Sequence, residues 1–183
     1  SLDRGGKIFS RTAPVIALPP GSSEADHLVL LSQLNSSTAC FWLKQICHNV
    51  SGSGVGRGIQ SEDWMGRRQF TATKLRTFPL ASVDDPTLVT FARHLDQCAN
   101  SRVSDSARSS VDAFCILGAP ALRTALDDRR KRDNDTILAM VALQEELDWY
   151  CYKLYAIDPT VETRSPDAVP RLCPGLRPFE IAL

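Results

Sequence analysis

Several features are missing from this sequence, and each absence excludes a class of protein. The 183 residues include 21 Lys/Arg and 21 Asp/Glu, so bulk charge gives no argument for a polyanionic partner. No run approaches the roughly 18 apolar residues that a membrane-spanning helix needs. No secretory signal peptide is visible. With 43% hydrophobic residues, the chain is too apolar for a disordered protein and long enough to bury a core.

Paired cysteines are also missing, because none of the six cysteines belongs to a CxxC motif. Cys40, Cys47 and His48 lie close in sequence, but no second ligand pair is spaced to complete a tetrahedral metal site. We therefore expect no bound metal, and reduced thiols buried in a helical core. Such cysteine usage is typical of cytoplasmic proteins, so the expected location is the cytoplasm.

The charges are unevenly distributed along the chain. Residues 1–80 contain nine Lys/Arg and five Asp/Glu, a net charge of +4, and residues 81–183 contain twelve and sixteen, a net charge of −4. This asymmetry points weakly to a polyanion-facing first half. The chain begins Ser1-Leu2 without an initiator methionine and closes on the apolar segment RPFEIAL, so we expect it to be a piece of a longer protein.

The first 82 residues are predicted to combine short strands with buried helices. Residues 7–18 (KIFSRTAPVIAL) and 69–73 (QFTAT) read as short strands. Ser23 and Asp26 resemble a helix capping box. Asn35-Ser36-Ser37 interrupts the apolar pattern and predicts a break before a second helix over residues 37–48. The expected fold class is mainly α with a small β component (α+β), in which helices surround a short-stranded element.

The second half is predicted to be helical. Asp84 or Asp85 caps a helix that Pro86 begins and that continues through Asn100. A further helix is expected over residues 105–117, and a long one from Pro120 to about Ile157, with a possible kink at residues 133–135. The long helix carries apolar residues at spacings of 3 and 4, which predict packing against the previous helix rather than a free coiled coil: Met140, Leu143, Leu147, Tyr150 and Leu154.

Composition divides the chain into three parts. Residues 1–82 combine short strands, buried helices and a loop rich in glycine and arginine, and residues 83–157 form a helical bundle or spacer. Residues 158–183 contain five prolines and are expected to be an extended tail.

Glycines alternate in the segment GSGVGRG, residues 52–58. A dinucleotide-binding fingerprint requires a preceding strand and a following helix, whereas here a predicted helix precedes and a polar loop follows. The Gly-Lys-Ser/Thr ending of a phosphate-binding P-loop is absent too. The segment therefore indicates a recognition loop and not a nucleotide site.

Basic residues and one tryptophan cluster in and after this loop, where residues 52–76 contain five Lys/Arg and two acids. Guanidinium groups suit phosphates and the edge of guanine, and an indole ring can stack or wedge. Trp64 is as well suited to sealing the loop onto the core as to contacting a ligand. We predict DNA-binding residues at six positions: Arg57, Trp64, Arg67, Arg68, Lys74 and Arg76.

Five sequence blocks resemble one protein family in the same order along the chain. They are DRGGKIFSRTAPVIALP, LNSSTACFWLKQICHN, EDWMGRRQFTATKLRTFPL, VALQEELDWYCYKLYAI and LRPFEIAL. These blocks are similar to the C-terminal region of large adenine-specific DNA methyltransferases of the type II restriction-modification and phage-growth-limitation class. The resemblance implies the target-recognition and helical region of such an enzyme.

The same resemblance implies where catalysis occurs. Such enzymes hold S-adenosylmethionine and an Asn-Pro-Pro-Tyr-type motif in a separate catalytic domain, and this sequence has no Asn-Pro-Pro motif. We therefore expect no catalytic residue and no cofactor in this chain, and S-adenosylmethionine in the parent enzyme. The expected partners are double-stranded DNA and the catalytic domain of the parent, with no membrane. The alternative is a helical protein–protein interaction or spacer module of the same enzyme.

Overall fold

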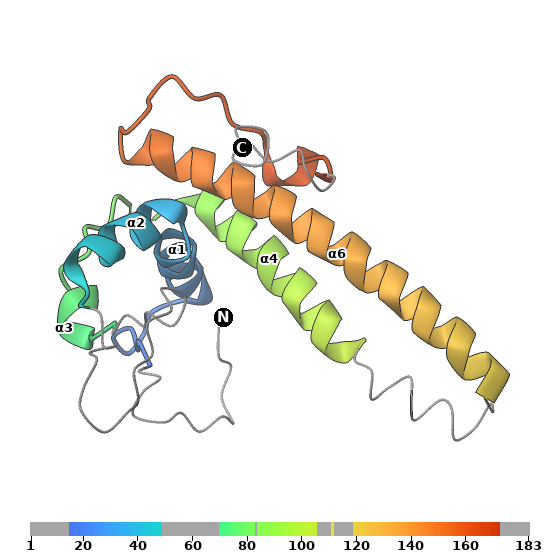
Figure 1. Cartoon of the computed structure of the whole chain (residues 1–183). Coiled ribbons are helices and arrows are strands. Elements are labelled where there is room, and N and C mark those ends of the chain that lie inside the picture. The colour runs from blue at the N-terminus through green and yellow to red at the C-terminus, as the bar shows by residue number, and fades with distance from the viewer. Residues whose placement is uncertain (1–14, 49–69, 83, 106–110, 112–118, 173–183) are drawn as a thin grey trace, which may run out of the picture.

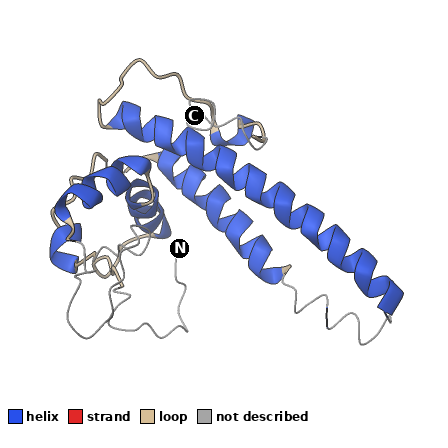
Figure 2. Cartoon of the chain, viewed as in Figure 1, coloured by secondary structure: helices blue, strands red, loops and turns tan. Residues whose placement is uncertain are grey.

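The computed structural model describes residues 15–48, 70–82, 84–105, 111 and 119–172. Within these ranges every long regular element is an α-helix, and no strand occurs (Figures 1 and 2). The α+β fold class and its short-stranded element were therefore wrong for the described part. The elements are α1 (Glu24–Leu34), α2 (Ser37–Ile46), α3 (Ala72–Leu75), α4 (Pro86–Ser104), α6 (Ala119–Leu154) and the 3₁₀-helix η2 (Pro166–Ala168).

The first two helices begin where their capping residues predict. The Ser23 hydroxyl accepts from the backbone N–H of Asp26 at 3.2 Å, and the Asp26 carboxylate accepts from the N–H of Ser23 at 2.7 Å, which completes the capping box. Ser36 separates α1 from α2: its hydroxyl accepts from the N–H of Ala39 at 3.1 Å and donates to the carbonyl oxygen of Gln33 at 2.7 Å. The predicted break is confirmed.

A helical turn begins in the described part, residues 70–73, of the strand that was expected over residues 69–73. The side chain of Thr71 accepts a hydrogen bond from the N–H of Lys74, so this β-branched residue acts as an N-cap. Helix α3 follows at once. The other predicted strand lies partly outside the described residues, and its described part, residues 15–18, has no regular structure.

Helix α4 begins as its sequence predicts, with Pro86 in the first turn. The Asp85 carboxylate accepts from the N–H groups of Thr87 at 2.9 Å and Leu88 at 3.1 Å. The same carboxylate accepts from the hydroxyl of Tyr150 on α6 at 2.9 Å. One residue therefore both caps α4 and ties it to α6.

The core lies where α1 meets an antiparallel hairpin of α4 and α6. Leu147 and Phe91 are fully buried, and the ring of Phe91 lies 6.2 Å from that of Tyr150. The seam predicted on α6 packs within the chain as expected, and α4 is a partner. The helix predicted over residues 105–117 lies almost entirely outside the described residues. Helix α6 runs without interruption through residues 133–135. The buried cluster consists of Val29, Leu88, Phe91, Leu143, Leu147 and Cys151.

The proline-rich tail returns along the hairpin after α6 ends (Figure 1). Pro166 is buried, and Val169 packs against the core cluster. At the rim, Asp167 lies 3.4 Å from His94, and Arg171 lies 3.3 Å from Asp135. The described tail, residues 158–172, is thus a strap on the helices, with little regular structure of its own.

None of the described helices is both long enough and apolar enough to cross a membrane.

Candidate nucleic-acid interface

Two of the six predicted DNA-binding residues lie in the described structure, and both are on or next to α3. Lys74 is half-buried in this helix, and Arg76 is the exposed residue that caps its C-terminus. Neither side chain forms an ion pair with another described residue. The other predicted contacts lie outside the described residues: Arg57, Trp64, Arg67 and Arg68.

Phe78 anchors the segment that carries these two cations. It is 7% exposed, and its ring centroid lies 5.6 Å from that of Trp42 on α2 and 6.0 Å from that of Tyr155. The contact with Trp42 is edge-to-face, a geometry that aromatic pairs prefer. Because Phe78 follows Arg76 by two residues, this anchor fixes α3 on the body of the protein.

Gln33 holds the chain immediately after that anchor. This glutamine is fully buried in α1, and its Oε1 accepts from the N–H of Ala81 at 2.8 Å and of Ser82 at 3.3 Å. Its Nε2 donates to the carbonyl oxygen of Ser82 at 2.6 Å. The hydroxyl of Tyr155 donates to the carbonyl oxygen of Pro79 at 2.9 Å, and burial raises the pKa of this tyrosine to about 12. Residues 79–82 are therefore tied to both α1 and the end of α6.

An apolar hollow of about 450 Å³ lies beside α3. Its walls come from α1, from α3 with the residues that follow it, and from residues 15–17, and Arg76 is the one cation among its lining residues. A hollow lined in this way does not suit a phosphate, whose oxygens need several donors. We therefore treat Arg76 as a surface cation and not as part of an enclosed site.

Asp148 fixes α2 to α6. Its Oδ1 accepts from the backbone N–H of Ser37 at 2.7 Å and from the side chain of Gln144 at 3.2 Å. Burial raises the pKa of this carboxyl, and the two hydrogen bonds partly oppose the shift. Acids grouped on one helix, here Glu145, Glu146 and Asp148, are normally solvated, and Asp148 departs from that rule.

Glu146 is engaged as well, because its carboxylate accepts from the backbone N–H of Arg164 in the strap. Its partner lies on the returning tail, so no helix-face pattern indicates the contact.

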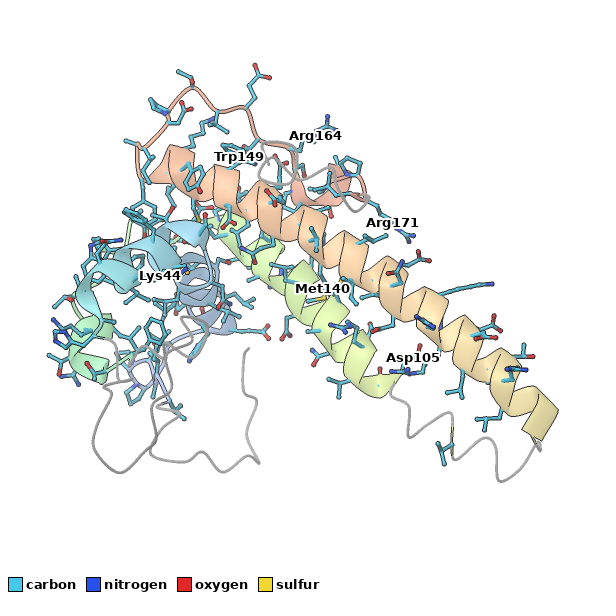
Figure 3. All side chains as sticks on the ribbon, in the orientation of Figure 1. Lys44, Asp105, Met140, Trp149, Arg164 and Arg171 are labelled. Carbon is cyan, nitrogen blue, oxygen red and sulfur yellow. The ribbon has the colours of Figure 1, made fainter. Side chains whose placement is uncertain are left out.

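A second group of charges joins the far ends of α4 and α6, which the sequence reading missed. The guanidinium of Arg102 donates to the carboxylate of Asp133 at 2.7 and 3.5 Å, and that of Arg132 donates to Asp105 at 2.8 and 3.0 Å. Arg129 donates to the backbone carbonyl of Asp105 at 2.8 Å. The signal that marks this region is the run RRKR at residues 129–132. Figure 3 labels Asp105 at the end of α4, beside α6.

The cysteines follow the expectation only in part. Cys47 and Cys151 are buried, whereas Cys40 is exposed on α2. Burial raises the pKa of the Cys151 thiol to about 12, so this thiol stays protonated and unreactive. The described residues contain no group of three or more His, Cys, Asp or Glu that could hold a metal ion.

A comparison with known proteins finds a similarity over the whole chain. The chain is 42% identical over 189 aligned positions to the adenine-specific methyltransferase PglX of Streptomyces coelicolor. The alignment covers 100% of this chain and 15% of the length of that protein. No protein-family model matches the chain, and no solved structure does. The chain therefore resembles one part of such an enzyme over its whole length.

Proposed function

We propose that this chain is the DNA-binding, non-catalytic region of an S-adenosylmethionine-dependent, adenine-specific DNA methyltransferase of a restriction-modification or phage-defence system in the cytoplasm. The observation that carries the proposal is the 42% identity to PglX over the entire chain. The coverage of 15% of that relative fits a region that acts together with a separate catalytic part.

Methylation of an adenine in a duplex requires a catalytic part and a part that binds the DNA. An adenine inside a duplex must be flipped out of the stack before its amino group can be methylated. The methyl donor and the reacting base belong to the catalytic part, because this chain has no Asn-Pro-Pro motif. The region described here grips the duplex and sets its register, mainly through contacts to the phosphate backbone.

Within this region, we assign Lys74, with Arg67 and Arg68 before it in the sequence, to the phosphates, and Arg57 and Trp64 to the groove. The placement of Lys74 supports this assignment, because α3 is anchored through Phe78 and through the buried Gln33. A cation on an anchored helix contacts a phosphate at a lower cost in conformational entropy than one on a free chain. Arg76 adds a further positive charge on the same helix end.

Two double charge reversals test the assignment. We expect Arg67→Glu with Arg68→Glu to abolish binding to a fluorescent duplex, and Lys74→Glu with Arg76→Glu to weaken it strongly. The matched control is Arg93→Glu with Lys153→Glu, which makes the same change in net charge at two exposed positions on α4 and α6. Unchanged duplex binding in both test variants would refute the assignment.

A helical interaction or spacer module of the same enzyme is the second candidate. Phe41 favours it, because this ring lies on α2 and is 68% exposed. The apolar seam on α6 is not available for such docking, because α4 already covers it. The salt dependence of binding distinguishes the two candidate functions. Apolar docking hardly responds to ionic strength, whereas phosphate contacts weaken steeply as the salt concentration rises.

A further inference from the structure

The α4–α6 hairpin extends well beyond the core, and ion pairs join the two helices at its far end. Helix α6 has 36 residues, a length of about 54 Å at 1.5 Å per residue. Among the residues of α6 whose burial is described, the last buried one toward the N-terminus is Ala142. Helix α4 ends at Ser104, beside residues 132 and 133 of α6. Residues 123–131 of α6 therefore lie past the end of α4.

The run RRKR at residues 129–132 divides into two pairs by the direction of its side chains. Arg129 and Arg132 turn toward the end of α4, where both bind Asp105. Arg130 and Lys131 are exposed instead, and no ion pair joins either of them to another described residue. The first pair positions the helix end, and the second pair is displayed to solvent.

Most of the nearby acids are already neutralised by arginines. Asp133 is held by Arg102, Asp105 by Arg132, and Asp135 by Arg171 (Arg171 and Asp105 are labelled in Figure 3). Two carboxylates of this region, Asp127 and Asp128, are outside these pairs. The same stretch of α6 carries four cations that also lie outside these pairs, which leaves an excess of two positive charges among the described residues of this end: Arg123, Arg129, Arg130 and Lys131.

We propose that this far end of the hairpin is a second phosphate-contacting surface for duplex DNA, with Arg130 and Lys131 as the contacting residues. The inference rests on the proposed function and extends it to a part of the chain that the sequence reading had assigned to a spacer. Residue 130 lies 17 positions from the fully buried Leu147, about 26 Å along α6. A contact at residue 130 therefore lies well away from the core. The separation is also a large part of one turn of B-DNA, which is about 34 Å.

The test is the salt dependence of duplex binding by the 183-residue chain. The probe is a fluorescent 30-base-pair duplex, and the variant is Arg130→Gln with Lys131→Gln. Each phosphate contact contributes about 0.9 to the slope of log K against log salt. We expect the variant to lower the magnitude of that slope by about 1.8 relative to the wild type. The control, Arg93→Gln with Lys153→Gln, removes the same charge from α4 and from the other end of α6 and is expected to leave the slope unchanged.

The possible outcomes separate this inference from the function on which it rests. If the wild type binds with a steep slope and the variant keeps that slope, the second surface is refuted while the DNA-binding function stands. An equal fall in test and control variants refutes it too, because the effect is then one of net charge. If the wild type shows no salt-dependent binding, the proposed function itself fails. Circular dichroism of each variant checks that α6 is intact.

Discussion

The side-chain nitrogen Nε2 of Gln33 donates a hydrogen bond to the carbonyl oxygen of Ser82 at 2.6 Å, across 49 positions of sequence. The glutamine is fully buried in α1, and its amide oxygen accepts from the N–H of Ala81 at 2.8 Å. One side chain thus satisfies a donor and an acceptor of the segment that follows α3. The position of the candidate DNA-contacting helix therefore depends on a buried amide in a different helix.

Replacing Gln33 by leucine keeps a similar volume and removes these hydrogen bonds. The partner groups belong to the exposed Ala81 and the half-buried Ser82, so each lost hydrogen bond costs about 0.5–1.5 kcal/mol, and we expect the variant to lose about 1–3 kcal/mol of unfolding free energy. Urea denaturation measures the loss. The control is Gln45→Leu at an exposed position of α2, expected to change stability by less than about 0.5 kcal/mol. Equal effects at the two positions would contradict the role of Gln33.

Phe91 lies in the core that joins α1 to the hairpin, and it is 0% exposed. We expect Phe91→Ala to reduce stability by about 3–5 kcal/mol, because the substitution removes apolar burial and leaves a cavity beside Tyr150. Thermal and chemical unfolding measure the change. The same substitution at the exposed Phe41 is the control, and it is expected to cost little. A loss of less than about 1 kcal/mol at Phe91 would mean that the core is not built as described.

Asp148 makes a pH-dependent contribution to the free energy of unfolding, and this contribution is unfavourable when the carboxylate is charged. The reason is that burial raises its folded-state pKa above 3.8. Above the folded pKa the charged, desolvated form opposes folding, and this penalty disappears as the pH falls through the folded pKa toward 3.8. We expect Asp148→Asn, which keeps an acceptor for the N–H of Ser37, to be most stabilised relative to the wild type at neutral pH. The difference should shrink as the pH falls, as urea denaturation across this range measures.

The control for that experiment is Asp148→Ala, which removes the acceptor and leaves the N–H of Ser37 without it. We expect this variant to be less stable than Asp148→Asn at every pH by about 1–3 kcal/mol. A stability difference between Asp148→Asn and the wild type that grows as the pH falls would refute the raised pKa.

The folded-state pKa values of Asp105 and Asp133 are shifted in the opposite direction from that of Asp148. Hydrogen bonds from Arg132 and Arg102 hold the pKa of each carboxyl below 3.8. Their contribution to the stability of this end of the α4–α6 hairpin is therefore present above pH 3.8. It is lost as the pH falls through their lower folded-state pKa values. We expect amide hydrogen exchange in the last turn of α4 to accelerate in acid relative to its first turn. An exchanged pair, Arg102→Asp with Asp133→Arg, should restore protection that either single change removes.

Local signals in the sequence predicted much of the helical framework. The pairing of Ser23 with Asp26, the break at Ser36 and the start of α4 at Asp85 and Pro86 all arise within a few residues of one another. A side chain that caps its own helix needs no tertiary context. The apolar spacing on α6 likewise predicted a packed seam, although not that α4 would be its partner.

The errors arise where a distant residue decides the outcome, or where one residue type serves two purposes. Thr71 is β-branched and favours a strand by composition, yet here its hydroxyl caps a helix. The contact of Asp148 carried no signal in the sequence, because its partner, Ser37, is 111 positions away. The pair of Arg102 with Asp133 spans 31 positions in the same way. Gln33 and Tyr155 hold the segment that follows α3, and the sequence did not indicate this role because their partners, Ser82 and Pro79, are also distant in sequence.

The central claim is that this helical body exists to hold cations against the phosphates of a duplex, and one measurement tests it most directly. The association constant of the 183-residue chain for a 30-base-pair duplex is measured by fluorescence anisotropy over a series of salt concentrations. The account predicts a linear fall of log K with log salt, with a slope of about −3 or steeper, as expected for several phosphate contacts. Binding that is absent, or that does not change with salt, would contradict it.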